Sequence, residues 1–234
     1  MPYDAAAEAL LDQVMKDWEG RGILGTLRSV VTEVWPRNQN RFETQLGDDN
    51  MVLGVQSSRN IQNLAVARLQ ERDVEAAIVE QSLQVKYAGR VLHIGKAPST
   101  ATAWSIDKQR WDDSEVRQLG AKANSQAYYP AEGALFPVRA GEPAALKHLH
   151  LTWQGLDGGI TRAWVGFPRA GDLSWFAVAP LAAADPLQRP VLPSGPALPP
   201  APNFDAMAEP ETELKLKPRS GEREGQRPAS GEQS

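Results

Sequence analysis

The chain has 234 residues, no cysteine and a formal net charge of −4. The length suits one domain with an appendage, and the absence of cysteine excludes disulfides, thiol nucleophiles and thiolate metal sites. Lysines and arginines are scattered singly, which disfavours nucleic-acid binding. No apolar run has the length of a membrane span, and the first residues lack a signal-peptide pattern, so we expect a cytoplasmic protein that does not bind membranes.

The first part of the chain predicts a helix over residues 4–19. Asp4 is its expected cap, and apolar residues recur at helical spacing up to Trp18. Residues 26–35 fit either a helix or a strand, since the helical spacing of their apolar residues competes with a high β-branched content.

The next segment predicts two short strands, Arg41–Leu46 and Met51–Val55, around a turn at residues 47–50. A helix should follow, capped by Ser57 or Ser58.

Residues 75–97 predict a sheet with a two-residue turn at Ala88-Gly89. That turn places Val85 opposite Leu92 and Gln84 opposite His93. Residues 112–126 then predict a polar helix, capped by Asp112 or Asp113 and anchored by Val116 and Leu119.

The last predicted strands are Leu146–Trp153, Ile160–Phe167 and Leu173–Ala179, joined by turns at Asp157-Gly158 and Ala170-Gly171. Short strands with such turns are typical of an antiparallel meander. The expected fold class is therefore α+β, with an antiparallel sheet packed against two or three helices.

The composition changes after Pro180. We expect one domain over residues 1–180, then a proline-rich linker and a disordered polar tail over residues 181–234. The apolar segment Phe204–Met207 interrupts the tail and would dock on the domain, dock on a partner, or have no contact.

All three histidines fall in predicted strands, and His148 and His150 point to the same face of theirs. With His93 they could form a zinc or iron site. The predicted turn, however, places His150 opposite Val165 and His148 opposite Phe167, on an apolar face shared with Ala163, Phe176 and Val178. Neutral structural imidazoles are then expected, with no bound metal or cofactor, and acid–base catalysis is a further alternative.

Acidic and basic residues offer a second, less specific pattern. The carboxylates of Asp48-Asp49 could bind a metal ion, and Glu80 with Lys86 or Lys96 are residue types found in nuclease cores. Acidic turn residues more often bind nearby backbone groups, so the sequence does not favour a nuclease.

Three tryptophans, Trp153, Trp164 and Trp175, lie on successive strands of the meander. The predicted register places them together on the face opposite the histidines. They would bind a flat ligand or a peptide, or pack in the core against the first helix.

These patterns favour a binding or interaction module with an unidentified protein or small-molecule partner. The alternative is a small hydrolase, metal-dependent or not, that uses the face of His148 and His150. Metal analysis of the purified protein would separate the two.

Overall fold

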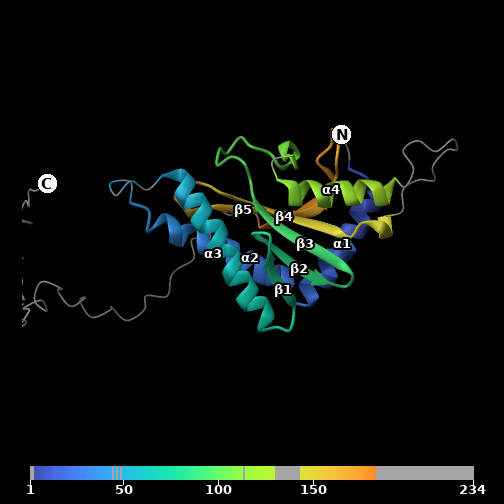
Figure 1. Ribbon diagram of the computed structural model, residues 1–234, viewed down its shortest axis with the longest axis horizontal. Helices are drawn as coiled ribbons and strands as arrows, with labels where there is room; N and C mark the ends of the chain where they lie inside the picture. The colour runs from blue at the N-terminus through green and yellow to red at the C-terminus, as the bar shows by residue number, and fades with distance from the viewer. Residues whose placement is uncertain are drawn as a thin grey trace, which may run out of the picture. The chain divides into compact units, whose positions relative to one another are not determined.

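The computed structural model describes residues 3–43, 45, 47, 49–112, 114–129 and 143–182 (Figure 1). The chain divides into a first unit, residues 1–187, and a second unit, residues 188–234, of which every residue lies outside the described part. The segment Phe204–Met207 and nearly all of the predicted tail therefore lie outside it as well. The main elements are α1 (Ala5–Gly20), α2 (Ile23–Gln39), α3 (Asn50–Gln70), β1 (Glu75–Val79), β2 (Ser82–Tyr87), β3 (Arg90–Lys96), α4 (Glu115–Tyr128), β4 (His148–Gly155), β5 (Thr161–Pro168) and β6 (Trp175–Ala182).

The six strands form one mixed sheet in the order β1-β2-β3-β4-β5-β6. The α+β class is confirmed, but the prediction of an antiparallel sheet is wrong at one pair. β3 and β4 are parallel, while every other neighbouring pair is antiparallel. The chain leaves β3, passes through α4, and enters β4 in the same direction, as a parallel pair requires.

Helices α1, α2 and α3 share one hydrophobic core with the sheet. Asp4 caps α1 as predicted, because its side chain accepts hydrogen bonds from the amides of Ala6 and Ala7. The ambiguous residues 26–35 are helical in α2, where Val30, Val31 and Val34 are buried.

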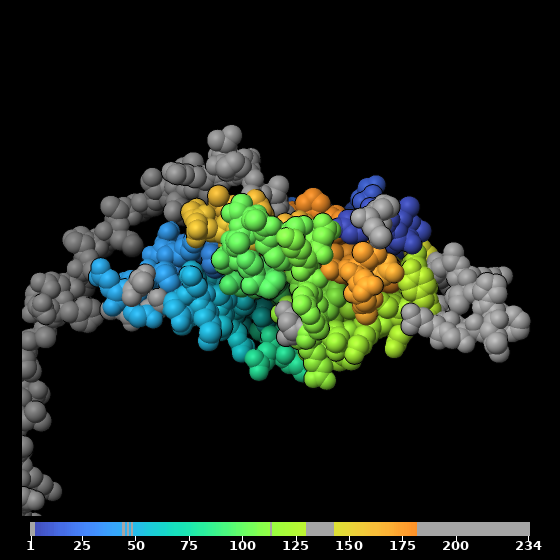
Figure 2. Space-filling model, turned by 90° about the horizontal axis from the view of Figure 1, so that it is seen from above, coloured from blue at the N-terminus to red at the C-terminus, as the bar shows by residue number. Residues whose placement is uncertain are grey.

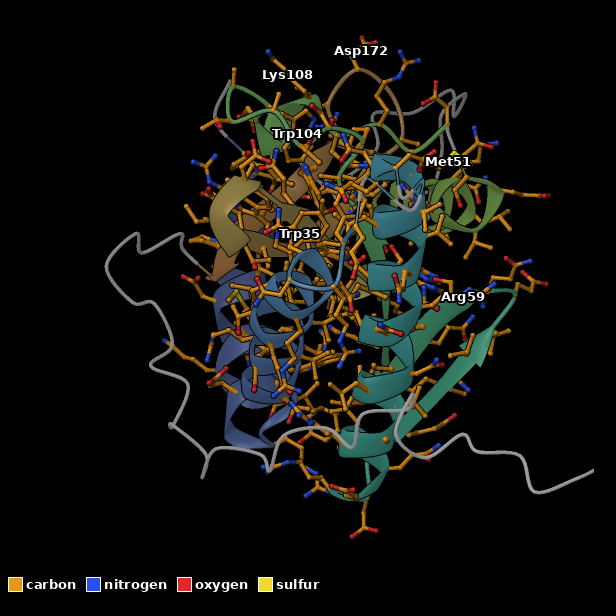
Figure 3. All side chains as sticks on the ribbon, turned by 90° about the vertical axis from the view of Figure 1, so that its left-hand side faces the viewer. Trp35, Met51, Arg59, Trp104, Lys108 and Asp172 are labelled. Carbon is orange, nitrogen blue, oxygen red and sulfur yellow. The ribbon has the colours of Figure 1, made fainter. Side chains whose placement is uncertain are left out.

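The predicted strand Met51–Val55 is wrong, because these residues form the first turns of α3. The Asp49 side chain accepts a 2.8 Å hydrogen bond from the Val52 amide and caps the helix there, eight residues before the predicted Ser57. Met51 lies at this exposed end of α3 (Figure 3). The described residues of the predicted strand Arg41–Leu46, namely 41–43 and 45, form no strand either.

The β2–β3 hairpin is confirmed with its register, which pairs Val85 with Leu92 and Gln84 with His93. Ala88 and Gly89 form the two-residue turn with φ angles of 48° and 72°. Two positive φ angles are the geometry of the turn that matches the twist of a hairpin.

The meander β4-β5-β6 is present, but the predicted register of β4 and β5 is wrong by one residue. The turn holds three residues, Asp157–Gly159, and is closed by a 2.8 Å hydrogen bond from the Leu156 amide to the Ile160 carbonyl. Leu151 therefore pairs with Val165, and His150 pairs with Gly166. Because side chains alternate between faces, this one-residue change moves the histidines away from Val165 and Phe167 to the other face of the sheet.

The second predicted turn also differs from the structure. The Arg169 amide donates to the Ser174 carbonyl around a longer loop, and β6 starts at Trp175. Val165 consequently pairs with Ala179.

Helix α4 covers the face of the sheet that α1, α2 and α3 leave open, and its Gly120 lies against the His148 side chain. It starts after Ser114, so the predicted caps Asp112 and Asp113 are wrong. The predicted anchor Leu119 is 58% exposed, and the buried positions are small or polar, Gly120, Ala121 and Asn124, with Tyr128 at the end.

Asn124 explains how a polar helix packs on this sheet. Its amide nitrogen donates to the carbonyls of His148 and Pro168, and its amide oxygen accepts from the backbone of Lys147 and His148. One buried side chain thus ties α4 to the start of β4 and the end of β5. None of the helices in the described residues is long and apolar enough to cross a membrane.

Candidate functional site

The parallel pair of β3 and β4 brings the three histidines together under α4. His93 pairs with His150 across the two strands, and the His93 and His148 rings are stacked with centroids 6.3 Å apart. The His150 ring lies edge-on to Trp111 at 4.9 Å. The sequence offered His93 only as an optional neighbour, since nothing in it indicates a parallel pair.

His93 and His150 are buried and His148 is half-buried, and burial lowers the pKa of all three imidazoles. His93 is 8% and His150 is 2% exposed. Burial, followed by repulsion from His148, lowers the pKa of His93 to about 4. Burial, then Arg117 and His93, lowers the pKa of His150 well below its usual value.

The surroundings of these histidines supply aromatic rings and a cation rather than further ligands. His150 contacts Trp111 and Trp175, and Arg117 is the nearby charge that disfavours its protonation. Within the described residues, no group of three histidine, aspartate or glutamate side chains is arranged to hold a metal ion.

The histidines belong to a line of polar groups along β3 and β4, all buried except the half-buried His148, which we call the polar strip: His93, His148, His150, Thr152 and Gln154. Each has a buried side-chain atom without a hydrogen-bond partner among the described residues, such as His150 Nε2 and Thr152 Oγ1. A buried polar atom without a hydrogen bond lowers the stability of a folded protein, and few such atoms occur in native structures. Five of them on one face of the sheet therefore distinguish this face from the apolar face that packs on α1, α2 and α3.

The three tryptophans of the meander do not share a face, so that prediction is wrong. Trp153 packs on Trp35 in the core on the helix side, with ring centroids 6.0 Å apart. Trp164 contacts Trp104, and Trp175 contacts Trp111, on the α4 side. The one-residue register change accounts for the separation of Trp153 from Trp164, which now lies opposite Thr152.

A pocket of about 350 Å³ lies beside residues 94–96 of β3. These residues extend past His93, the last residue of β3 that pairs with β2. We call this cavity the α3–α4 pocket. Apolar surface comes from Ile94, Val116 and Trp153, so one of the three tryptophans does line a cavity. The polar lining comes from both flanking helices, from the end of β3 and from the β1–β2 turn: Ser58, Gln62, Glu80, Gln81, Ser82, Gly95, Lys96, Ser114 and Arg117.

Two cations, Lys96 and Arg117, and one described carboxylate, Glu80, belong to the lining of this pocket. Burial lowers the pKa of Lys96, and its Nζ lies 5.9 Å from the centre of the Trp35 ring. A side chain at Gly54 would bring its Cβ within 2.5 Å of that Nζ, so glycine here allows the ammonium to approach α3. At Gly95, an added Cβ would lie 3.3 Å from Arg117 Cζ and 2.9 Å from His150 Nε2. The Arg117 side chain thus lies between the pocket and the polar strip.

A second hollow of about 470 Å³ lies between residues 107–112, α4 and residues 170–174. Lys108 and Asp172 lie near each other at this end of the molecule (Figure 3). Figure 2 shows the segment between β3 and α4, coloured green, at the centre of the visible face. Among the charged residues that line the hollow, Asp112 forms an ion pair with Arg110 at 2.5 Å, and Asp107 accepts a hydrogen bond from the Tyr3 hydroxyl.

Comparison with known proteins gives no functional guide, since no protein-family model, curated protein or solved structure matches the chain.

Sequence reasoning missed the α3–α4 pocket because its residues come from five separate segments. Gln62, Lys96, Ser114 and Arg117 form no motif in the chain. In the sequence Lys96 is only a common residue type, and its place in the same pocket as Gln62 depends on the packing of α3 against β3.

Proposed function

We propose that this protein is a binding module and that its ligand site is the α3–α4 pocket. The observation that carries the proposal is the composition of the pocket lining. Apolar surface from Ile94 and Trp153 is combined with a few converging polar groups from three elements. Small-molecule sites generally have this composition and a volume of roughly 300–1,000 Å³, and the pocket has about 350 Å³.

The alternative, a hydrolase acting through His148 and His150, has less support. A general base must reach the proton that it abstracts, directly or through one water. His150 is 2% exposed and contacts Trp111 and Trp175. His148 is more exposed but stacks on His93 and lies against Gly120 of α4. We therefore assign the polar strip to packing rather than to catalysis.

A screen of water-soluble metabolites by ligand-observed NMR tests the proposal on the full chain. We expect hits that are lost in Ser58→Phe, which fills the pocket from α3. Asn63→Phe is the matched control, because Asn63 lies on the same helix, is exposed and does not line the pocket. Hits that bind Ser58→Phe as well as the wild-type protein would place the ligand elsewhere, and an absence of hits would contradict the binding-module proposal.

A further inference from the structure

We propose that the α3–α4 pocket recognises an anionic group, a phosphate or carboxylate, on a small molecule that also carries hydrogen-bond donors. This inference rests on the proposed function, since it assigns a ligand class to that same pocket.

The charges of the pocket favour an anion. Lys96 and Arg117 line it, and Glu80 is the one acidic residue among its described lining residues. Glu80 is exposed at the β1–β2 turn, where solvent weakens its field. The Lys96 ammonium is half-buried against Gly54 and Trp35, so an anion next to it would offset the cost of its burial.

The start of α4 adds hydrogen-bond donors on the opposite wall. α4 has 14 residues, and the Ser114 side chain at its start makes no capping hydrogen bond. The first amides of a helix point outward without partners in the helix and carry a partial positive charge. Ser114, the residue before the helix, and Arg117, in its first turn, line the pocket, so a ligand anion there would meet amide, hydroxyl and guanidinium donors together.

Gln62 indicates that the ligand carries a hydrogen-bond donor in addition to its anionic group. Its side chain is 8% exposed and lines the pocket from α3, and its amide oxygen has no hydrogen-bond partner among the described residues. A buried acceptor is stabilised by a donor. Hydroxyl groups beside the anion would supply that donor, as in a phosphorylated or carboxylated polyol.

Calorimetric titration of the full chain with glycerol 3-phosphate, glycerate and glycerol, at constant ionic strength, tests the inference. We expect at least one of the two anions to bind and glycerol not to bind. The two anions separate the phosphate and carboxylate forms of the proposal. Lys96→Gln and Arg117→Gln should each weaken binding about 10-fold or more, as expected for the loss of a charge-assisted hydrogen bond.

Two further variants separate the site from general charge effects. Lys122→Gln removes one positive charge from an exposed position of α4 that does not line the pocket, so its affinity should stay within about 2-fold of wild type. Gly54→Ala keeps every charge but displaces the Lys96 ammonium, and it should weaken binding. Unfolding curves of all variants would show that each is folded.

The outcomes that overturn the inference differ from those that overturn the proposed function. If Lys122→Gln weakens anion binding as much as Lys96→Gln does, the loss of affinity follows from the net charge of the protein, and the proposed anion site is rejected. If neither anion binds while neutral metabolites bind and are lost in Ser58→Phe, the anion inference fails and the binding site remains. If no ligand is found whose binding is abolished by Ser58→Phe, the anion inference and the proposed binding site both fail.

Discussion

Gly155, at the end of β4, lies where the core has no room for a side chain. A Cβ there would lie less than 3.0 Å from carbons of the Trp35 indole. The ring cannot easily move aside, because its N–H donates a 2.8 Å hydrogen bond to the Leu156 carbonyl. Gly155 therefore fixes the approach of α2 to the sheet.

Gly155→Ala should lower the free energy of unfolding by about 1–3 kcal/mol, the usual cost of overpacking. Urea denaturation would measure the change. Gly20→Ala is the control, since a Cβ at Gly20 meets nothing within 4 Å and alanine favours a helix. A Gly155→Ala variant as stable as wild type would show that Trp35 can be displaced.

Leu151 and Thr152 are both buried, on opposite faces of β4. Leu151→Ala should cost about 2–5 kcal/mol, because it removes a large side chain from the core. Thr152→Val keeps the shape and removes a buried hydroxyl that has no partner among the described residues. We expect its free energy of unfolding to equal or exceed that of wild type in the same urea experiment. A loss above about 1 kcal/mol would show that the hydroxyl makes a hydrogen bond.

At the scale of elements, turn length decided which parts of the sheet could be predicted. The β2–β3 register follows directly from Ala88-Gly89, a two-residue turn with one favoured geometry. The sequence Asp157-Gly158-Gly159 fits two or three residues equally well, and the third residue reverses which face of β4 meets Val165. The start of α3 was mistaken for a strand because the capping role of Asp49 was overlooked.

The polar strip on β3 and β4 predicts a specific loss of stability in acid. His93 has a pKa of about 4 in the folded chain and about 6.5 when unfolded. The unfolded state thus binds more protons between these values, so the stability present above pH 6.5 falls as the pH drops towards 4. For His93 alone the loss amounts to about 3 kcal/mol. His150 and His148, which lie beside His93, have lowered pKa values as well, so they contribute to stability with the same dependence on pH.

Urea denaturation between pH 7.5 and pH 4 measures this dependence. His93→Leu should reduce the slope between pH 6.5 and pH 5, with the wild-type chain as reference. An equally steep profile in the variant would assign the acid sensitivity to other groups.

At the scale of the whole molecule, the sequence predicts local structure well and the pairing of distant segments poorly. The β2–β3 hairpin, the α1 cap and the existence of the meander depend on neighbouring residues. The parallel β3–β4 pair joins strands separated by α4, and the α3–α4 pocket combines segments from α3 to β4, so no local pattern contains that information. The histidine cluster also depends on the parallel β3–β4 pair. The sequence therefore identifies its three members but does not predict that His93 lies beside His148 and His150.

Removal of residues 188–234 should leave the domain folded. The hydrophobic core comes from residues between Ala7 and Leu181, and the sequence after Leu187 is rich in proline and charge. Thermal unfolding of the shortened chain should give a Tm within about 4 °C of the full chain. A decrease beyond about 8 °C would show that the removed segment stabilises the domain.

The parallel β3–β4 pair also has a consequence for the rate of folding. The β2–β3 hairpin joins residues as near in the chain as Lys86 and Val91, whereas the next strand pair joins Val91 to His148. Closing the longer loop costs more entropy before any contact repays it. We therefore expect the hairpin to form early and the encounter of β3 with β4 to limit the folding rate. Leu149, on β4 opposite Leu92, would then influence the speed of folding more strongly than Val85 does.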